Sequence, residues 1–180
     1  ADNNTAVGHA ALTANTTGAS NTSVGSGSLA SNTTASNNTA VGLLALNSNT
    51  TGSVNTAVGL STLQLNTTGV NNVAVGGDAL LANTTGQDNT SIGINAGSSN
   101  TTGNGNVFIG HDAGRTGSPG GNNTTGSNSV FFGDGNMGNC FIQTDWTVSS
   151  DQRDKTDFTA LDLGLDFVKA LAPVTYKWDK

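Results

Sequence analysis

Positions 38–54 read NTAVGLLALNSNTTGSV, and this pattern recurs along the chain at an interval of 17 residues. A Val-Gly or Ile-Gly step marks each repeat, at Val7, Val24, Val41, Val58, Val75, Ile92 and Ile109. The tripeptide Asn-Thr-Thr keeps the same interval from Asn15 to Asn100. Strict periodicity of this length is typical of repeat architectures, in which each repeat forms one structural unit.

The consensus NTAVGxxALxxNTTGxx predicts one coil of a parallel β-solenoid, or β-roll, and therefore an all-β fold. Thr-Ala-Val has the alternation and β-branching of a strand, and Ala-Leu supplies a second apolar spot. Glycine and asparagine supply the turns. We expect two short strands and two turns per coil, with coils about 4.8 Å apart. Each asparagine would then lie over its counterpart and form an amide ladder.

The repeats predict three segments: a β-roll over residues 1–133, a connector over 134–149 and a tail over 150–180. The seventh repeat carries six additional residues at 116–121, which we expect to protrude as a loop. The repeat is also irregular here, because Gly97 and Gly114 replace leucine while Phe108 and Phe131 replace alanine. These changes predict a wider interior, filled by three aromatic residues, Phe131, Phe132 and Phe141.

The composition excludes several classes of protein. Of 180 residues, 25 are glycine, 24 asparagine and 27 threonine, so each coil has few large apolar side chains. Packing several chains side by side would bury the second apolar stripe, which favours an oligomer. Arg115 is the only cation before residue 150, so no nucleic-acid partner is expected. No apolar run is long enough for membrane insertion. The lone Cys140 has neither a disulfide partner nor zinc-site spacing, and no cofactor is expected.

The tail differs in character from the repeats. Apolar residues recur there at helical spacing, at Phe158, Leu161, Leu165, Val168 and Leu171. Pro173 would end this helix, and residues 174–178 could form a final strand. We therefore expect a short α+β tail after the β-roll.

The stretch Ala40-Val41-Gly42-Leu43-Leu44-Ala45 resembles the head repeats of trimeric autotransporter adhesins. This resemblance covers about residues 1–133. It implies a left-handed parallel β-roll in which three chains surround one axis. A bacterial trimeric adhesin head is accordingly one functional hypothesis.

The tail resembles the start of the endosialidase-type intramolecular chaperone, through SDQRDK at 150–155, GLDFV at 164–168 and LAPVTY at 171–176. Together with IQTDWT at 142–147, it is similar to fibre proteins of tailed phages. The resemblance implies a homotrimeric structural fibre of the virion, outside the cell. Its partners would be other tail or virion proteins and a host-surface receptor, such as a glycan. The family's domain continues well beyond position 180, so we expect a truncated or uncleaved chain.

The chaperone resemblance also implies self-cleavage of the Ser149–Ser150 bond. Ser150 would be the nucleophile and Lys155 the base, although Ser150 could equally cap a helix. No other enzymatic activity is expected. A glycan-degrading tailspike is a further hypothesis, disfavoured because aromatic residues are nearly absent before Phe108.

The remaining residue patterns predict one receptor-contact zone and no metal or glycosylation site. The irregular end is the expected receptor-contact zone, with Arg115, Pro119 and Trp146. His9 and His111 share one repeat slot, but His111 has only Asp112 as an acidic neighbour, so no metal site is expected. The aspartates at 78, 88, 112 and 134 lack the pattern of calcium-binding β-rolls. Glycosylation sequons, as at Asn15, are interpreted as turn residues.

Overall fold

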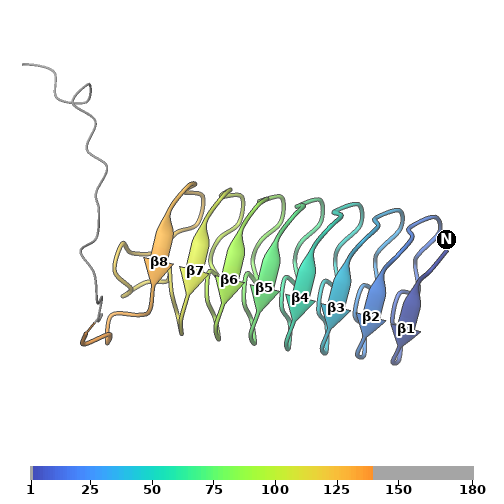
Figure 1. Ribbon diagram of the computed structural model, residues 1–180, viewed down its shortest axis with the longest axis horizontal. Coiled ribbons are helices and arrows are strands. Elements are labelled where there is room, and N and C mark those ends of the chain that lie inside the picture. Colours follow the sequence, from blue (N-terminus) through green and yellow to red (C-terminus); the bar gives the residue numbers. More distant parts are fainter. Residues whose placement is uncertain (1, 140–180) are drawn as a thin grey trace, which may run out of the picture. The chain divides into compact units, whose positions relative to one another are not determined.

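The computed structural model describes residues 2–139, which form a parallel β-solenoid (Figure 1). Eight strands pair in sequence order, each in parallel with the next. They are β1 (Thr5–Val7), β2 (Thr22–Val24), β3 (Thr39–Val41), β4 (Thr56–Val58), β5 (Val73–Val75), β6 (Thr90–Ile92), β7 (Val107–Ile109) and β8 (Val130–Phe132). Thr39 pairs with Thr56, and Val41 with Val58, so the register is the repeat period. The predicted fold class and the 17-residue coil are confirmed.

Each coil contains one strand, so the expectation of two strands per coil is wrong. The leucine of the second apolar spot has a left-handed backbone in every coil that carries it, with φ of 50° at Leu46 and Leu80. A strand requires negative φ, so this side of the coil is built of turns. Its backbone still bonds to the next coil, because the Leu46 N–H donates to the Thr62 carbonyl over 3.0 Å.

The interior of the solenoid lies within a single chain. The middle residue of each strand from β2 to β8 points inward and is buried, as Ala57 and Phe108 show. The leucines at 29, 46, 63 and 80 are fully buried on the opposite wall. The Ala-Leu stripe therefore needs no neighbouring chain to cover it. Our expectation that oligomerisation buries this stripe is wrong, because the turns already direct it inward.

Two ladders of buried asparagines flank the apolar interior, as the repeat predicts. In one ladder each amide bonds to the preceding coil, as where Asn66 Nδ2 donates to Asn49 Oδ1 over 2.8 Å and Asn83 Nδ2 to Asn66 Oδ1 over 2.8 Å. In the other, the Asn55 backbone N–H donates to Asn38 Oδ1 over 2.9 Å. The sequon asparagines Asn32, Asn49 and Asn66 belong to these ladders, and their side chains are buried and inaccessible to solvent.

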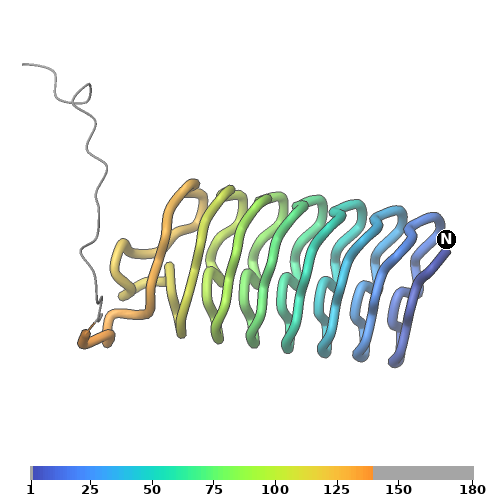
Figure 2. Tube along the Cα trace, in the orientation of Figure 1, coloured from blue at the N-terminus to red at the C-terminus, as the bar shows by residue number. Residues whose placement is uncertain are grey.

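The insertion enlarges the coil between β7 and β8, where paired residues are 23 rather than 17 positions apart. Figure 2 shows it as an additional loop beside the regular stack of coils. The asparagine ladder is interrupted at this step. Asn100 Oδ1 and Asn123 Nδ2, which would form the next rung, are buried without a partner.

The aromatic residues of the irregular end follow the alternation of the strands. Phe108 and Phe131 point inward and stack, with ring centroids 5.1 Å apart. Phe132 points outward and is 41% exposed, so the expectation that it fills the interior is wrong. The position after an inward-facing strand residue must face out. Phe141 and the predicted tail helix and strand lie outside the described residues.

Candidate functional site

One face of the eight-stranded sheet carries a continuous apolar column on its outside. The last residue of each strand points outward, and most of these side chains are more than a third exposed, including Val7, Ile92 and Ile109. Two positions further along the chain, Leu43, Leu60 and Ile94 are about half exposed. We call this surface the valine face; it comprises Val7, Val24, Val41, Val58, Val75, Ile92, Ile109 and Phe132 together with Leu43, Leu60 and Ile94. No residue among 2–139 covers it.

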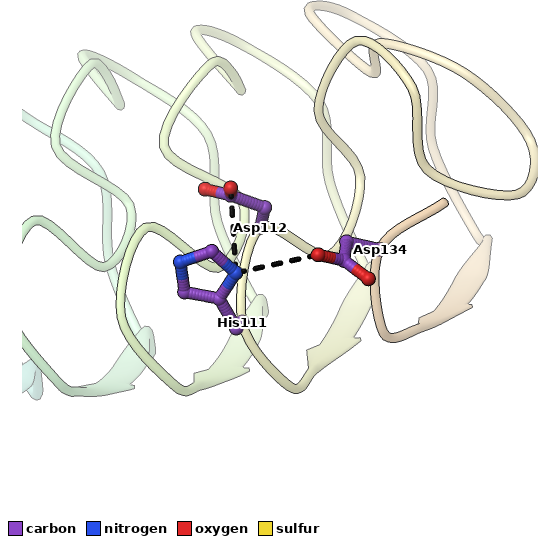
Figure 3. Close-up of side chains that lie close together, drawn as sticks. All are labelled: His111, Asp112 and Asp134. Carbon is purple, nitrogen blue, oxygen red and sulfur yellow. Dashed lines mark ion pairs between the residues drawn. The ribbon is translucent and has the colours of Figure 1, made fainter. Parts of the chain in front are cut away.

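The last two coils bring a histidine and two aspartates together beside the insertion (Figure 3). His111 Nδ1 lies 3.4 Å from Asp112 Oδ2 and 3.5 Å from Asp134 Oδ2. His111 and Asp134 occupy the same slot in successive coils, directly after the Gly of the repeat. We call these three residues the His-Asp cluster. An open hollow next to it is lined by both aspartates and by Thr116, Gly117, Gly135 and Asn136.

Each aspartate of the His-Asp cluster is held by a second group. Arg115 Nη1 donates to Asp112 Oδ1 over 2.7 Å, and this hydrogen bond lowers the pKa of the Asp112 carboxyl below its ordinary value. The Asn136 backbone N–H donates to Asp134 Oδ1 over 2.9 Å, which lowers the pKa of Asp134 in the same direction. Both effects favour the charged carboxylate, because the donors bind it more strongly than the neutral acid.

The two predicted receptor-contact residues within the described part of the chain differ in how freely their side chains are exposed. Pro119 is exposed within the insertion, whereas the Arg115 side chain is 40% exposed and paired with Asp112. Trp146 and the predicted cleavage residues Ser150 and Lys155 lie outside the described residues. The His-Asp cluster was missed by our sequence reasoning, which gave His111 only Asp112 as an acidic neighbour. The available signal was the shared repeat slot of His111 and Asp134, obscured by the six added residues.

The described part of the chain thus belongs to the class of β-solenoid repeat proteins. Residues 150–180 match the family described as chaperone of endosialidase, which confirms that part of the predicted resemblance. Comparison with curated proteins found no significant match, and neither did comparison with solved structures. Within residues 2–139, no helix has the length and apolar character that crossing a bilayer requires.

Proposed function

We propose that this protein is a structural fibre segment of a phage particle, assembled as a homotrimer, that takes part in attachment to the host surface. The single observation that carries the proposal is the valine face, an apolar column that repeats once per coil, in a chain whose residues 150–180 match the chaperone of endosialidase family. Soluble monomers rarely leave a large contiguous apolar surface exposed.

Copies of the same chain are the partners that fit the valine face best. Its side chains recur at the coil spacing of about 4.8 Å, and an identical solenoid presents apolar side chains at that same spacing. From β1 to β6 the positions of this face hold no Asp, Glu, Lys or Arg, so none of these charges would be buried along this part of the contact. In a trimer, the coils supply the rigid fibre while the insertion stays at one end as a candidate contact loop.

The trimer is tested by placing one charge on the valine face. Leu60 lies on this face and Val54 lies elsewhere, and both are 52% exposed. We expect Leu60→Asp to convert a trimer into monomers in light scattering coupled to size-exclusion chromatography, since the trimer would bury the carboxylate. Val54→Asp is the matched control, because its repeat slot holds Asp88 in another coil. A monomeric unmodified protein, or equal effects of both variants, would contradict the proposal.

The location in the virion needs a separate experiment. Antibodies raised against the chain should decorate the tail fibres of the particle in electron micrographs. Decoration of a bacterial surface in the absence of phage would instead favour the adhesin.

Self-cleavage also belongs to this proposal, and a chain extended beyond position 180 should release a fragment that ends at Ser149. Ser150→Ala should abolish that release.

A further inference from the structure

One set of valine-face positions, two residues after the end of each strand, holds ionisable residues in the last two coils. The slot that holds Leu43, Leu60 and Ile94 in earlier coils holds His111 and then Asp134. Asp112 follows His111 directly and completes the His-Asp cluster. An imidazole nitrogen and two carboxylate oxygens are ligand types that bind first-row transition metals and zinc.

The distances within the cluster are those of long ion pairs, and they also match the separation of two ligand atoms on one cation. Hydrogen bonds from nitrogen to oxygen are usually about 2.7–3.2 Å long. The distances of 3.4 Å and 3.5 Å from His111 Nδ1 to the two carboxylate oxygens exceed that range. Ligand atoms about 2.0–2.1 Å from a tetrahedral zinc ion are roughly 3.3–3.5 Å apart. All three potential ligand atoms lie within 4.8 Å of one another. A modest rotation of the two aspartate side chains would therefore also bring the two carboxylate oxygens to the separation that one ion requires.

Both carboxylates are oriented by neighbouring donors, which leave Oδ2 of Asp112 free and hold Oδ2 of Asp134 only through the longer of its two hydrogen bonds. Arg115 binds Oδ1 of Asp112, while Oδ2 faces His111. Asn136 binds Asp134 through its backbone N–H at Oδ1 and, more weakly, through Nδ2 at Oδ2 over 3.2 Å. Metal-binding carboxylates are commonly held by such outer partners. Two carboxylates and the Arg115 guanidinium sum to a charge of −1, so the group still attracts a cation.

We propose that His111, Asp112 and Asp134 of one chain form a binding site for a divalent transition-metal ion of the zinc class. The imidazole ligand selects against calcium and magnesium, which prefer oxygen ligands. The adjacent hollow leaves the remaining coordination positions open to water or to a ligand from outside the chain. The site would tie the last two coils together across the enlarged coil, where the asparagine ladder is interrupted. This inference does not depend on the proposed fibre role.

The test is a titration of the metal-free chain with Co²⁺ and Zn²⁺ at neutral pH. Cys140→Ser is introduced in every sample, because a thiolate also binds these ions. We expect one ion per chain by calorimetry, with a visible cobalt spectrum that zinc abolishes and millimolar calcium does not. His111→Gln, Asp112→Asn and Asp134→Asn should each weaken binding by ~10-fold or more. His9→Gln is the matched control, because it changes the same slot of the first coil and should leave the affinity unchanged.

Circular dichroism establishes that each variant remains folded, so that a loss of affinity reports on ligation. The proposal is overturned if the metal-free chain binds neither ion, or if His111→Gln and His9→Gln have the same effect. One ion per three chains, sensitive to His111→Gln but not to the aspartate variants, would also overturn it. That result would instead place three histidines from different chains around one ion.

Discussion

The ring of Phe108 occupies the space that a larger residue at Gly97 would fill. A Cβ at position 97 would lie 2.6 Å from Cδ2 of Phe108, which is closer than real side chains approach. A Cβ at Gly114, on the other side of the ring, would also overlap it. The phenylalanine therefore takes the volume of the leucines that the last regular coils lack. The interior therefore stays filled, because the large side chain comes from the strand wall here and from the opposite wall in the regular coils.

This exchange predicts a compensating set of substitutions. Phe108→Ala should lower the stability of the chain by about 3–5 kcal/mol, because it leaves a large cavity. Adding Gly97→Leu and Gly114→Leu to this variant should recover much of the loss, because both leucines restore the consensus interior. Gly97→Leu alone should destabilise the protein. Denaturant unfolding at fixed protein concentration compares these three variants with the unmodified chain; independent, additive effects would contradict the exchange of volume.

The asparagine ladder predicts that a buried amide cannot be replaced by an acid. The Asn66 amide donates to Asn49 Oδ1 and to the Gly69 carbonyl. Asn66→Asp should cost about 3 kcal/mol or more, because it removes these donors and buries a charge among acceptors. Asn37→Asp is the control, because Asn37 is exposed and Asp88 occupies its slot in another coil. Equal melting temperatures for the two variants would show that the ladder contributes little.

The close stacking of coils predicts unequal effects of adding a methyl group to two glycines. Gly42 has φ of 143°, and a Cβ there would collide with the carbonyl group of Gly59 in the next coil. Gly42→Ala should therefore destabilise the solenoid by ~2 kcal/mol or more. Gly77→Ala should be nearly neutral, because nothing lies within 4 Å of its added Cβ. Thermal unfolding of both variants checks the difference, and a well-tolerated Gly42→Ala would refute this packing.

The pairing of Arg115 with Asp112 predicts a pH dependence in the acidic range. Because the folded-state pKa of Asp112 is lowered from 3.8, this pairing stabilises the protein above that value and is lost as the pH falls below it. Arg115→Gln should raise the pKa of Asp112 towards the ordinary value, as measured by carbon NMR of the carboxyl group. The pKa of Asp134 should change much less, because it is set mainly by Asn136. An unchanged Asp112 pKa in this variant would disprove the pairing.

The fold could be predicted from the sequence because each coil repeats the same local backbone conformation. The 17-residue spacing of Val41 and Val58 determined the strand register, and Asn49 over Asn66 followed from the same spacing. The sequence did not reveal that Leu46 adopts a left-handed backbone, because leucine rarely does so outside a context that demands it. It therefore also failed to show which apolar column stays exposed.

The candidate site was harder to predict than the fold. His111 and Asp134 are 23 positions apart because six added residues separate their shared repeat slots, and the structure shows that their side chains meet. The pairing of Arg115 with Asp112 likewise depends on the turn that follows β7. Periodicity determines which residues stack, but it gives no information on the direction of side chains where the period changes.

The most direct test of the central claim, that each 17-residue repeat forms one coil in register with the next, is a pair of spin-label distances. Labels at Thr17 and Thr85 are four repeats apart, and labels at Thr17 and Thr102 are five; all three positions are exposed. In the Cys140→Ser background, diluted with unlabelled chains, we expect about 19 Å and 24 Å, an increase of one coil spacing. Equal distances, or an increase far from ~4.8 Å, would contradict the in-register solenoid.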